Sequence, residues 1–220
     1  MTETTGSTEG HGGAVAAVRR VVVFFGLVAS GKSTLAKLWA DRHGFPYANS
    51  DAVRKGLAGS PGATRGLGLG EGIYSAEFTR RTYDALAGFA VAQLAGAPTV
   101  VLDGSYHRRE ERDRLRQALS SQATVLFVLC HCGEAAVKAR LARRALDPHA
   151  VSDGDWRVYL RQRERFEAPT ELPEGTFFTL CSEELPQQLA RRLDQLLGSG
   201  EGAGAGEKAA SPRGRAAVNR

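Results

Sequence analysis

The feature that most constrains this chain is the stretch from residue 21 to residue 39. It opens with five apolar residues of high strand propensity, which predict a short buried strand. Gly26, Gly31, Lys32 and Ser33 then fit the pattern G-x-x-x-x-G-K-[ST] of a phosphate-binding loop, or P-loop.

A helix is predicted directly after this loop, because Leu35, Leu38 and Trp39 recur at the spacing of one helix face. The glycines let the backbone turn its N–H groups toward a polyphosphate, and the helix N-terminus adds a favourable dipole. The stretch therefore predicts that residues 26–34 bind a nucleoside triphosphate.

Two side chains of the loop have individual expected roles. Lys32 supplies a positive charge to the β- and γ-phosphates of ATP, and the Ser33 hydroxyl ligates Mg²⁺. The residues expected to contact the nucleotide are Gly26, Ala29, Ser30, Gly31, Lys32, Ser33 and Thr34.

The composition is that of an ordinary water-soluble protein with one domain in 220 residues. Three cysteines without framework spacing suit a reducing cytosol. No apolar run approaches the ~20 residues of a membrane helix, and residues 1–17 lack the apolar core of a signal peptide. We therefore expect a cytoplasmic protein with no membrane partner. The net charge of +5 suits anionic ligands; it admits a nucleic-acid partner without favouring one.

The domain is predicted to span residues 18–197. Residues 1–17 have too few apolar residues for a core and are expected to be disordered. Residues 198–220 form a Gly-rich, basic tail that is expected to be flexible, and either to be solvated or to contact a partner.

Strands and helices are predicted to alternate through this domain. Strand candidates are 21–25, 45–49, 99–102, 124–130 and 177–180. Helix candidates after the P-loop helix are 52–57, 76–95, 108–121, 133–144, 155–167 and 183–197, and loops are expected at 58–72 and 145–152. The predicted fold class is α/β: a P-loop NTPase three-layer sandwich, nucleoside-monophosphate-kinase-like, with a five-stranded, mainly parallel sheet. Ligands of such a sheet lie at the carboxyl ends of its strands.

Two aspartates follow predicted strands at that edge. Two roles are open for Asp51. It is either a general base that accepts a proton from an attacking hydroxyl, or an N-cap of the next helix. Arg54, one helical turn later, is a candidate for binding the acceptor substrate. Asp103, after an apolar strand, is a candidate for holding Mg²⁺.

Arginines gather before the loop at 145–152. Arg140 and Arg144 are one turn apart, and as catalytic residues of a lid they would neutralise charge on the transferred phosphoryl group. The alternative is a solvated helix end, which the helix dipole favours for cations.

These motifs together resemble a bacterial family of small P-loop kinase-like ATP-binding domains, of the AAA family ATPase group, close to polynucleotide kinases and zeta-toxin-like kinases. The resemblance covers about residues 21–169. Beyond the P-loop it rests on Ser50-Asp51 with Arg54, Val101-Leu102-Asp103-Gly104, Arg140 to Arg144, and Tyr159 with Gln162. It implies that Asp51 is the general base, that Arg54 holds the acceptor and that Arg144 belongs to the lid. The chain departs from the commoner family pattern at 103–107, where it reads Asp-Gly-Ser-Tyr-His.

The function predicted is an ATP- and Mg²⁺-dependent transfer of phosphate to a hydroxyl of an unidentified acceptor, either a small molecule or a nucleic-acid 5′ end. Two alternatives stay open: a nucleoside-monophosphate-kinase-like enzyme whose acceptor is a phosphate, and an ATP-hydrolysing regulatory module.

Overall fold

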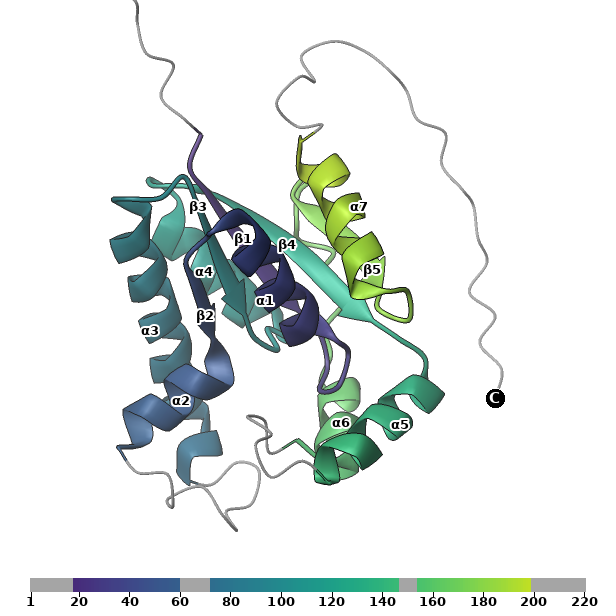
Figure 1. Cartoon of the computed structure of the whole chain (residues 1–220). Helices are drawn as coiled ribbons and strands as arrows, with labels where there is room; N and C mark the ends of the chain where they lie inside the picture. Colours follow the sequence, from purple (N-terminus) through teal and green to yellow (C-terminus); the bar gives the residue numbers. More distant parts are fainter. Residues whose placement is uncertain (1–17, 60–71, 147–153, 199–220) are drawn as a thin grey trace, which may run out of the picture.

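The sheet of this protein has five strands, all parallel, in the order β2-β3-β1-β4-β5 (Figure 1). The computed structural model describes residues 18–59, 72–146 and 154–198. The strands are β1 (Arg20–Phe25), β2 (Tyr47–Asn49), β3 (Thr99–Asp103), β4 (Thr124–His131) and β5 (Phe177–Cys181). The predicted α/β class with a five-stranded sheet is confirmed.

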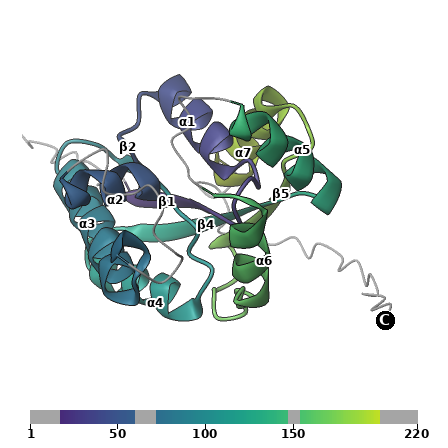
Figure 2. The ribbon, with the colours of Figure 1, turned by 90° about the horizontal axis from the view of Figure 1, so that it is seen from below.

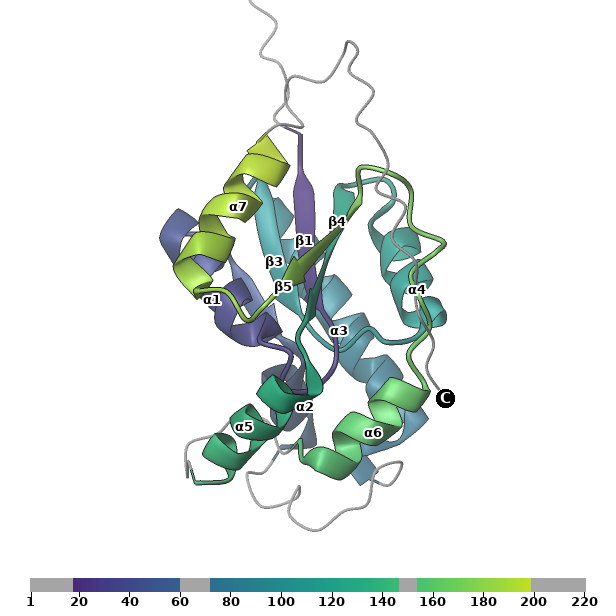
Figure 3. The ribbon, with the colours of Figure 1, turned by 90° about the vertical axis from the view of Figure 1, so that its right-hand side faces the viewer.

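Helices cover both faces of the sheet and its carboxyl edge. They are α1 (Lys32–His43), α2 (Ser50–Ala58), α3 (Ala76–Leu94), α4 (Arg109–Leu119), α5 (Glu134–Ala145), α6 (Trp156–Glu164) and α7 (Pro186–Gly198), with a short 3₁₀ helix η1 (Gly72–Tyr74) before α3. Helices α1 and α7 pack on one face and α3 and α4 on the other, as Figure 2 shows. Helices α2, α5 and α6 lie at the carboxyl ends of the strands (Figure 3). Of the helices described, none has the length and apolarity needed to cross a bilayer.

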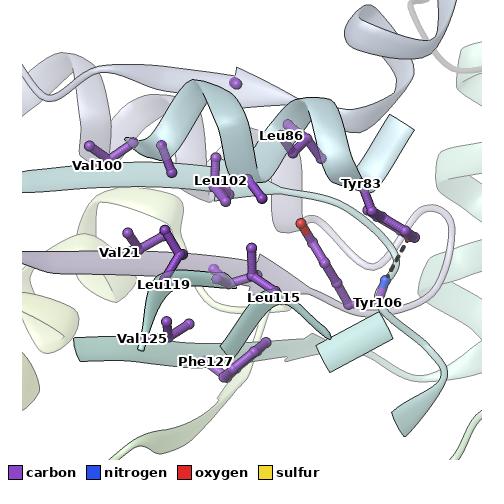
Figure 4. Close-up of a cluster of buried hydrophobic side chains, with 14 of the residues drawn as sticks. Val21, Tyr83, Leu86, Val100, Leu102, Tyr106, Leu115, Leu119, Val125 and Phe127 are labelled. Carbon is purple, nitrogen blue, oxygen red and sulfur yellow. Dashed lines mark hydrogen bonds between the residues drawn. The ribbon is translucent and has the colours of Figure 1, made fainter. Parts of the chain in front are cut away.

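The central strand β1 is buried on both sides, which explains its continuous apolar sequence. Val21, Val23 and Phe25 point into the core beneath α3 and α4, part of which Figure 4 shows. Val22 and Phe24 point to the opposite core, beneath α1 and α7. All five are fully buried. This strand therefore fixes the P-loop, which follows it, to the centre of the sheet.

Several predicted boundaries shift by a few residues. The strand expected from Phe45 begins at Tyr47, because Pro46 has no N–H to donate to a ladder. The helix expected to reach Glu167 ends at Glu164, and the Glu167 N–H instead donates to the carbonyl of His107 at 2.9 Å. The last helix begins at Pro186, a residue suited to the first helical position. The expected tails, the loop at 58–72 and the lid at 145–152 fall wholly or largely outside the described residues.

Candidate active site

The P-loop joins β1 to α1 with a backbone that depends on its glycines. Gly26 has a φ of 138°, and a Cβ there would lie 2.3 Å from the carbonyl oxygen of Cys130. Gly31, with a φ of 86°, is the N-cap of α1 and provides no side chain to cap it. The first N–H groups of α1 therefore have no capping side chain and are available to an anion.

The P-loop lysine folds back over the loop. Lys32 Nζ donates to the carbonyl oxygen of Leu27 at 3.2 Å, so its charge lies across the loop rather than outside it. Ser33 and Thr34 are exposed in the first turn of α1. The arrangement brings an ammonium, two hydroxyls and a helix N-terminus to one place, which suits a polyphosphate.

Asp103 ends β3 beside the P-loop and is fully buried. Its Oδ2 accepts hydrogen bonds from the Tyr47 hydroxyl at 3.0 Å and the Asn49 amide at 2.5 Å. Its Oδ1 is buried with no direct hydrogen-bond partner among the described residues. Burial raises the pKa of Asp103, while the charge of Lys32 and the nearby Ser33 hydroxyl act to lower it. A buried carboxylate oxygen left unpaired beside a lysine and a serine hydroxyl fits a divalent cation.

Asp51 lies in the first turn of α2, and the N-cap interpretation of this residue is wrong. The N-cap is Asn49, whose side-chain oxygen accepts from the N–H groups of Asp51 and Ala52 at 2.9 and 3.1 Å. Asp51 is partly exposed, and its carboxylate makes no hydrogen bond or ion pair within the described ranges. The carboxylate is therefore available to a ligand.

Arg54 is buried, with 7% of its surface exposed. Its Nη1 donates to the carbonyl of Ile73 at 2.5 Å and to the Thr79 hydroxyl at 3.2 Å, and its guanidinium lies over the ring of Tyr74. Arg54 thus joins α2 to η1 and α3, on the same side of the sheet edge as Asp51.

The two arginines of α5 have different surroundings. Arg140 Nη1 donates to the carbonyl of Ala29 at 3.1 Å and to the Ser182 hydroxyl at 2.9 Å. Arg144 is partly buried, and its Nη1 is buried without a hydrogen-bond partner among the described residues. The first guanidinium therefore contacts the P-loop backbone, and the second retains an unpaired donor.

The turn after β3 carries the sequence that departs from the family pattern. The Ser105 carbonyl accepts from the Gly26 N–H at 3.3 Å, which ties this turn to the P-loop. The Tyr83 hydroxyl lies 2.9 Å from Ser105 Oγ and accepts from the Tyr106 N–H at 3.1 Å. Tyr106 has a φ of 38°, a strained value for a residue other than glycine.

Two titratable groups lie beside this turn. Burial lowers the pKa of His107 to about 4, helped by the charges of Arg108 and Arg165, so its imidazole is neutral at pH 7. Burial raises the pKa of Glu111 to about 7, against a hydrogen bond from the Arg108 N–H. The turn after β3 and the start of α4 therefore present a neutral imidazole and a carboxyl group that titrates near neutral pH, and the charge of Arg54 acts on that carboxyl group.

Sequence reasoning assigned no role to several residues that support this site. Asn49 could have been suspected, because it ends the strand before Ser50-Asp51. Gln162 accepts from the Val28 N–H through its Oε1 at 2.7 Å, and the Ser182 hydroxyl donates to the Ser30 carbonyl at 2.5 Å. Both lie more than 130 positions from the loop that they contact. Gln162 was part of the family resemblance but without a role, and no local pattern marks Ser182.

Known proteins resemble this chain in sequence profile and in fold. The sequence profile of the AAA domain family matches residues 21–169. No curated protein sequence matches the chain. Among solved structures, a sugar kinase from Janibacter sp. HTCC2649 is similar, with 25% identity, a TM-score of 0.61, and coverage of 82% of this chain and 95% of that one.

Two further solved structures share the fold. A gluconokinase from Sinorhizobium meliloti 1021 has 21% identity and a TM-score of 0.57, over 83% of this chain and 93% of that one. An APS kinase from Mycobacterium tuberculosis, in complex with AMPPNP and APS, has 19% identity and a TM-score of 0.54, over 83% and 98%. The fold is therefore that of P-loop NTPases of the kinase type.

Proposed function

Because the chain belongs to the AAA domain family, and because its P-loop is complete, we propose that it is an ATP- and Mg²⁺-dependent phosphotransferase acting on a hydroxyl group of a small molecule. The observation that carries this proposal is the position of the Asp51 carboxylate. Asp51 lies in the first turn of α2, at the carboxyl edge of the sheet from which the P-loop also emerges, and its carboxylate has no partner in the described part of the chain. The similarity to a sugar kinase at 25% identity supports a small hydroxylated acceptor.

The proposed reaction is an in-line transfer. The N–H groups at the start of α1, together with Lys32, bind the β- and γ-phosphates. Asp51 accepts the proton of the acceptor hydroxyl as its oxygen forms a bond to the γ-phosphorus. The bond from that phosphorus to the bridging oxygen breaks, and ADP leaves. Arg144, with its unpaired Nη1, would stabilise the charge that spreads over the phosphoryl oxygens. Arg140, whose Nη1 and Nη2 are bonded to Ala29 and Ser182, would act through the P-loop instead.

Two residues are proposed to hold Mg²⁺. The unpaired Oδ1 of Asp103 and the adjacent hydroxyl of Ser33 have the hard oxygen donors that this ion prefers. When bound with ATP, Mg²⁺ would neutralise charge on the β- and γ-phosphate oxygens.

The position of Arg54 supports a hydroxyl acceptor over a phosphate acceptor. A phosphate acceptor needs cations that face it, whereas Arg54 is buried and its Nη1 is already bonded to Ile73 and Thr79, so that at most Nε and Nη2 remain as donors to a ligand. Arg54 remains the proposed substrate-binding residue. It would line the site of an acceptor that is mainly uncharged. A phosphate acceptor would also be repelled by the Asp51 carboxylate.

The experiment that tests the proposal is ADP release from ATP and Mg²⁺ with a panel of acceptors. The panel contains sugars, sugar acids, nucleosides, nucleoside monophosphates and 5′-hydroxyl oligonucleotides, and Lys32→Ala is the inactive control. Stimulation by a hydroxylated small molecule, absent in Lys32→Ala, is the expected result. Stimulation by a monophosphate alone would favour the monophosphate-kinase alternative. Hydrolysis that no acceptor stimulates would favour the regulatory module.

A further inference from the structure

Three successive residues of the P-loop each have a backbone group held by a side chain from a distant element. The Val28 N–H donates to Gln162 Oε1 of α6 at 2.7 Å. The Ala29 carbonyl accepts from Arg140 Nη1 of α5 at 3.1 Å, and the Ser30 carbonyl accepts from Ser182 Oγ at 2.5 Å.

Arg140 and Ser182 act as one unit, because they are also bonded to each other. Arg140 Nη1 and Nη2 donate to the hydroxyl and the carbonyl of Ser182, at 2.9 and 2.5 Å. Val28 and Ala29 also belong to a small buried cluster, together with Tyr159 of α6 and Val137 of α5, and Leu141 of α5 packs against it. Both helices are thus attached to the loop by one polar and several apolar contacts.

The loop needs such support because its backbone is strained. Ala29 has a φ of 59°, in the left-handed region that residues other than glycine and asparagine rarely adopt. Gly31 lies so close to the holding residues that a Cβ there would be 2.9 Å from Ser182 Oγ and 3.1 Å from Arg140 Nη1. Gly31 is therefore required by this contact as well as by its own positive φ.

Holding these carbonyls also directs the N–H groups. A trans peptide is planar, so its N–H points away from its carbonyl oxygen. The Ser30 carbonyl points to Ser182, and the N–H of Gly31 in the same peptide therefore points to the opposite side. This N–H is one of those that a P-loop presents to phosphate.

We propose that Arg140, Gln162 and Ser182 form a P-loop brace: they are positioning residues that hold residues 28–30 in the phosphate-binding shape, an inference that rests on the proposed function. A loop held in this way has less conformational freedom to lose when ATP binds, so the brace increases ATP affinity. It acts through the loop and needs no contact with the nucleotide.

The test uses two variants of the full chain that remove a polar contact and keep the side-chain length, Arg140→Met and Gln162→Met. Their matched controls are Arg157→Met, an exposed arginine of α6, and Gln117→Met, an exposed glutamine of α4. Equilibrium binding of ATP is measured below the melting temperature of every variant. The brace predicts a rise in the ATP Kd of about tenfold in each brace variant, and a change of less than twofold in each control.

Kinetics separate positioning from a purely structural role and from catalysis. The brace predicts that the KM for ATP rises with the Kd, while the KM for the acceptor stays constant and kcat at saturating ATP changes less. Because both side chains hold one loop, the double variant should raise the Kd by less than the product of the single effects. If Arg140→Met fails to fold, Gln162→Met decides the test by the same criteria.

Three outcomes would overturn the brace. If the wild type binds ATP tightly and folded Gln162→Met has the same ATP Kd, the brace is overturned while the proposed function stands. A lower kcat of Arg140→Met at unchanged ATP Kd would assign Arg140 to the transition state instead. A wild-type protein that does not bind ATP would overturn the brace together with the proposed function.

Discussion

Asn49 and Asp103 lie opposite each other at the ends of β2 and β3, and the Asn49 amide donates to Oδ2 of Asp103 at 2.5 Å. The oxygen of the same amide caps α2 by accepting from the N–H of Asp51. One side chain therefore links the candidate Mg²⁺ carboxylate to the helix that carries the candidate base.

Replacing this link should affect stability and activity together. Asn49→Ala removes a helix cap, worth about 1 kcal/mol, and a hydrogen bond to a buried carboxylate, worth about 1.5–3 kcal/mol. We expect the free energy of unfolding to fall by about 2–4 kcal/mol, measured by urea denaturation. Asn49→Ser keeps the cap and loses the bond, so it should lie between Asn49→Ala and the wild type. Equal stability of both variants would exclude a contribution from the cap.

Asp51→Asn tests the base. The change is nearly isosteric, so the ATP Kd should be retained, while kcat with the acceptor falls ~10²–10⁴-fold because no carboxylate takes the proton. Background hydrolysis of ATP should fall much less. Transfer at the wild-type rate would leave Asp51 without a catalytic role and would favour the monophosphate-kinase alternative.

Arg144→Ala tests the lid hypothesis. If its contact strengthens as charge spreads over the phosphoryl oxygens, kcat should fall ~10–10³-fold while the ATP Kd changes little. Steady-state kinetics with direct ATP binding distinguish the cases. A loss of ATP affinity at constant kcat would assign Arg144 to ground-state binding, and unchanged kinetics would leave it without a role in the reaction.

Glu111 predicts a pH dependence of stability. Its pKa is raised from 4.5 to about 7 on folding, so the unfolded chain loses this proton at lower pH than the folded chain. The associated stability is fully present below about pH 4.5 and is lost as the pH rises through 7. Glu111→Gln lacks this loss, so it should gain stability over the wild type between these pH values, by up to about 3 kcal/mol. His107, whose pKa is lowered to about 4, works in the opposite direction in both proteins.

Chemical denaturation of both proteins at several pH values measures that difference. A difference that does not change between pH 4.5 and 7.5 would show that Glu111 ionises normally in the folded state. Glu110→Gln is the matched control, because Glu110 is exposed on the same helix turn.

Tyr106→Phe should be neutral or stabilising. The Tyr106 side chain is fully buried against the apolar core, and its hydroxyl has no hydrogen-bond partner among the described residues (Figure 4). Removing an unsatisfied buried hydroxyl avoids a desolvation cost of about 1–3 kcal/mol, which thermal unfolding would detect as a higher Tm. Tyr83→Phe is the contrasting variant. The Tyr83 hydroxyl accepts from the Tyr106 N–H, so its removal should lower the Tm. A marked loss of stability in Tyr106→Phe would indicate an ordered water at that hydroxyl.

Parts of the site could be predicted because their signals are local. The P-loop, from Gly26 to Ser33, needs only its own residues and the strand and helix that flank it, and all three are contiguous in the chain. Asp51 and Asp103 were identified as candidates because each follows a strand, and the carboxyl ends of parallel strands meet at one edge. Asp51 was left between two roles, because whether it caps α2 depends on the residue at which that helix begins. The structure shows that the helix begins at Ser50, with Asn49 as its cap.

What the sequence by itself determined is the α/β class, the P-loop with its lysine, and the edge at which the aspartates emerge, because short-range spacing encodes each of them. The tertiary structure alone decided that β2 lies beside β3, so that Asn49 meets Asp103, and that Arg140, Gln162 and Ser182 close on the P-loop. The residues joined by these contacts are separated by between 54 and 152 positions in the sequence. No local pattern encodes them, because they depend on the order of the strands and on how the helices pack against that edge.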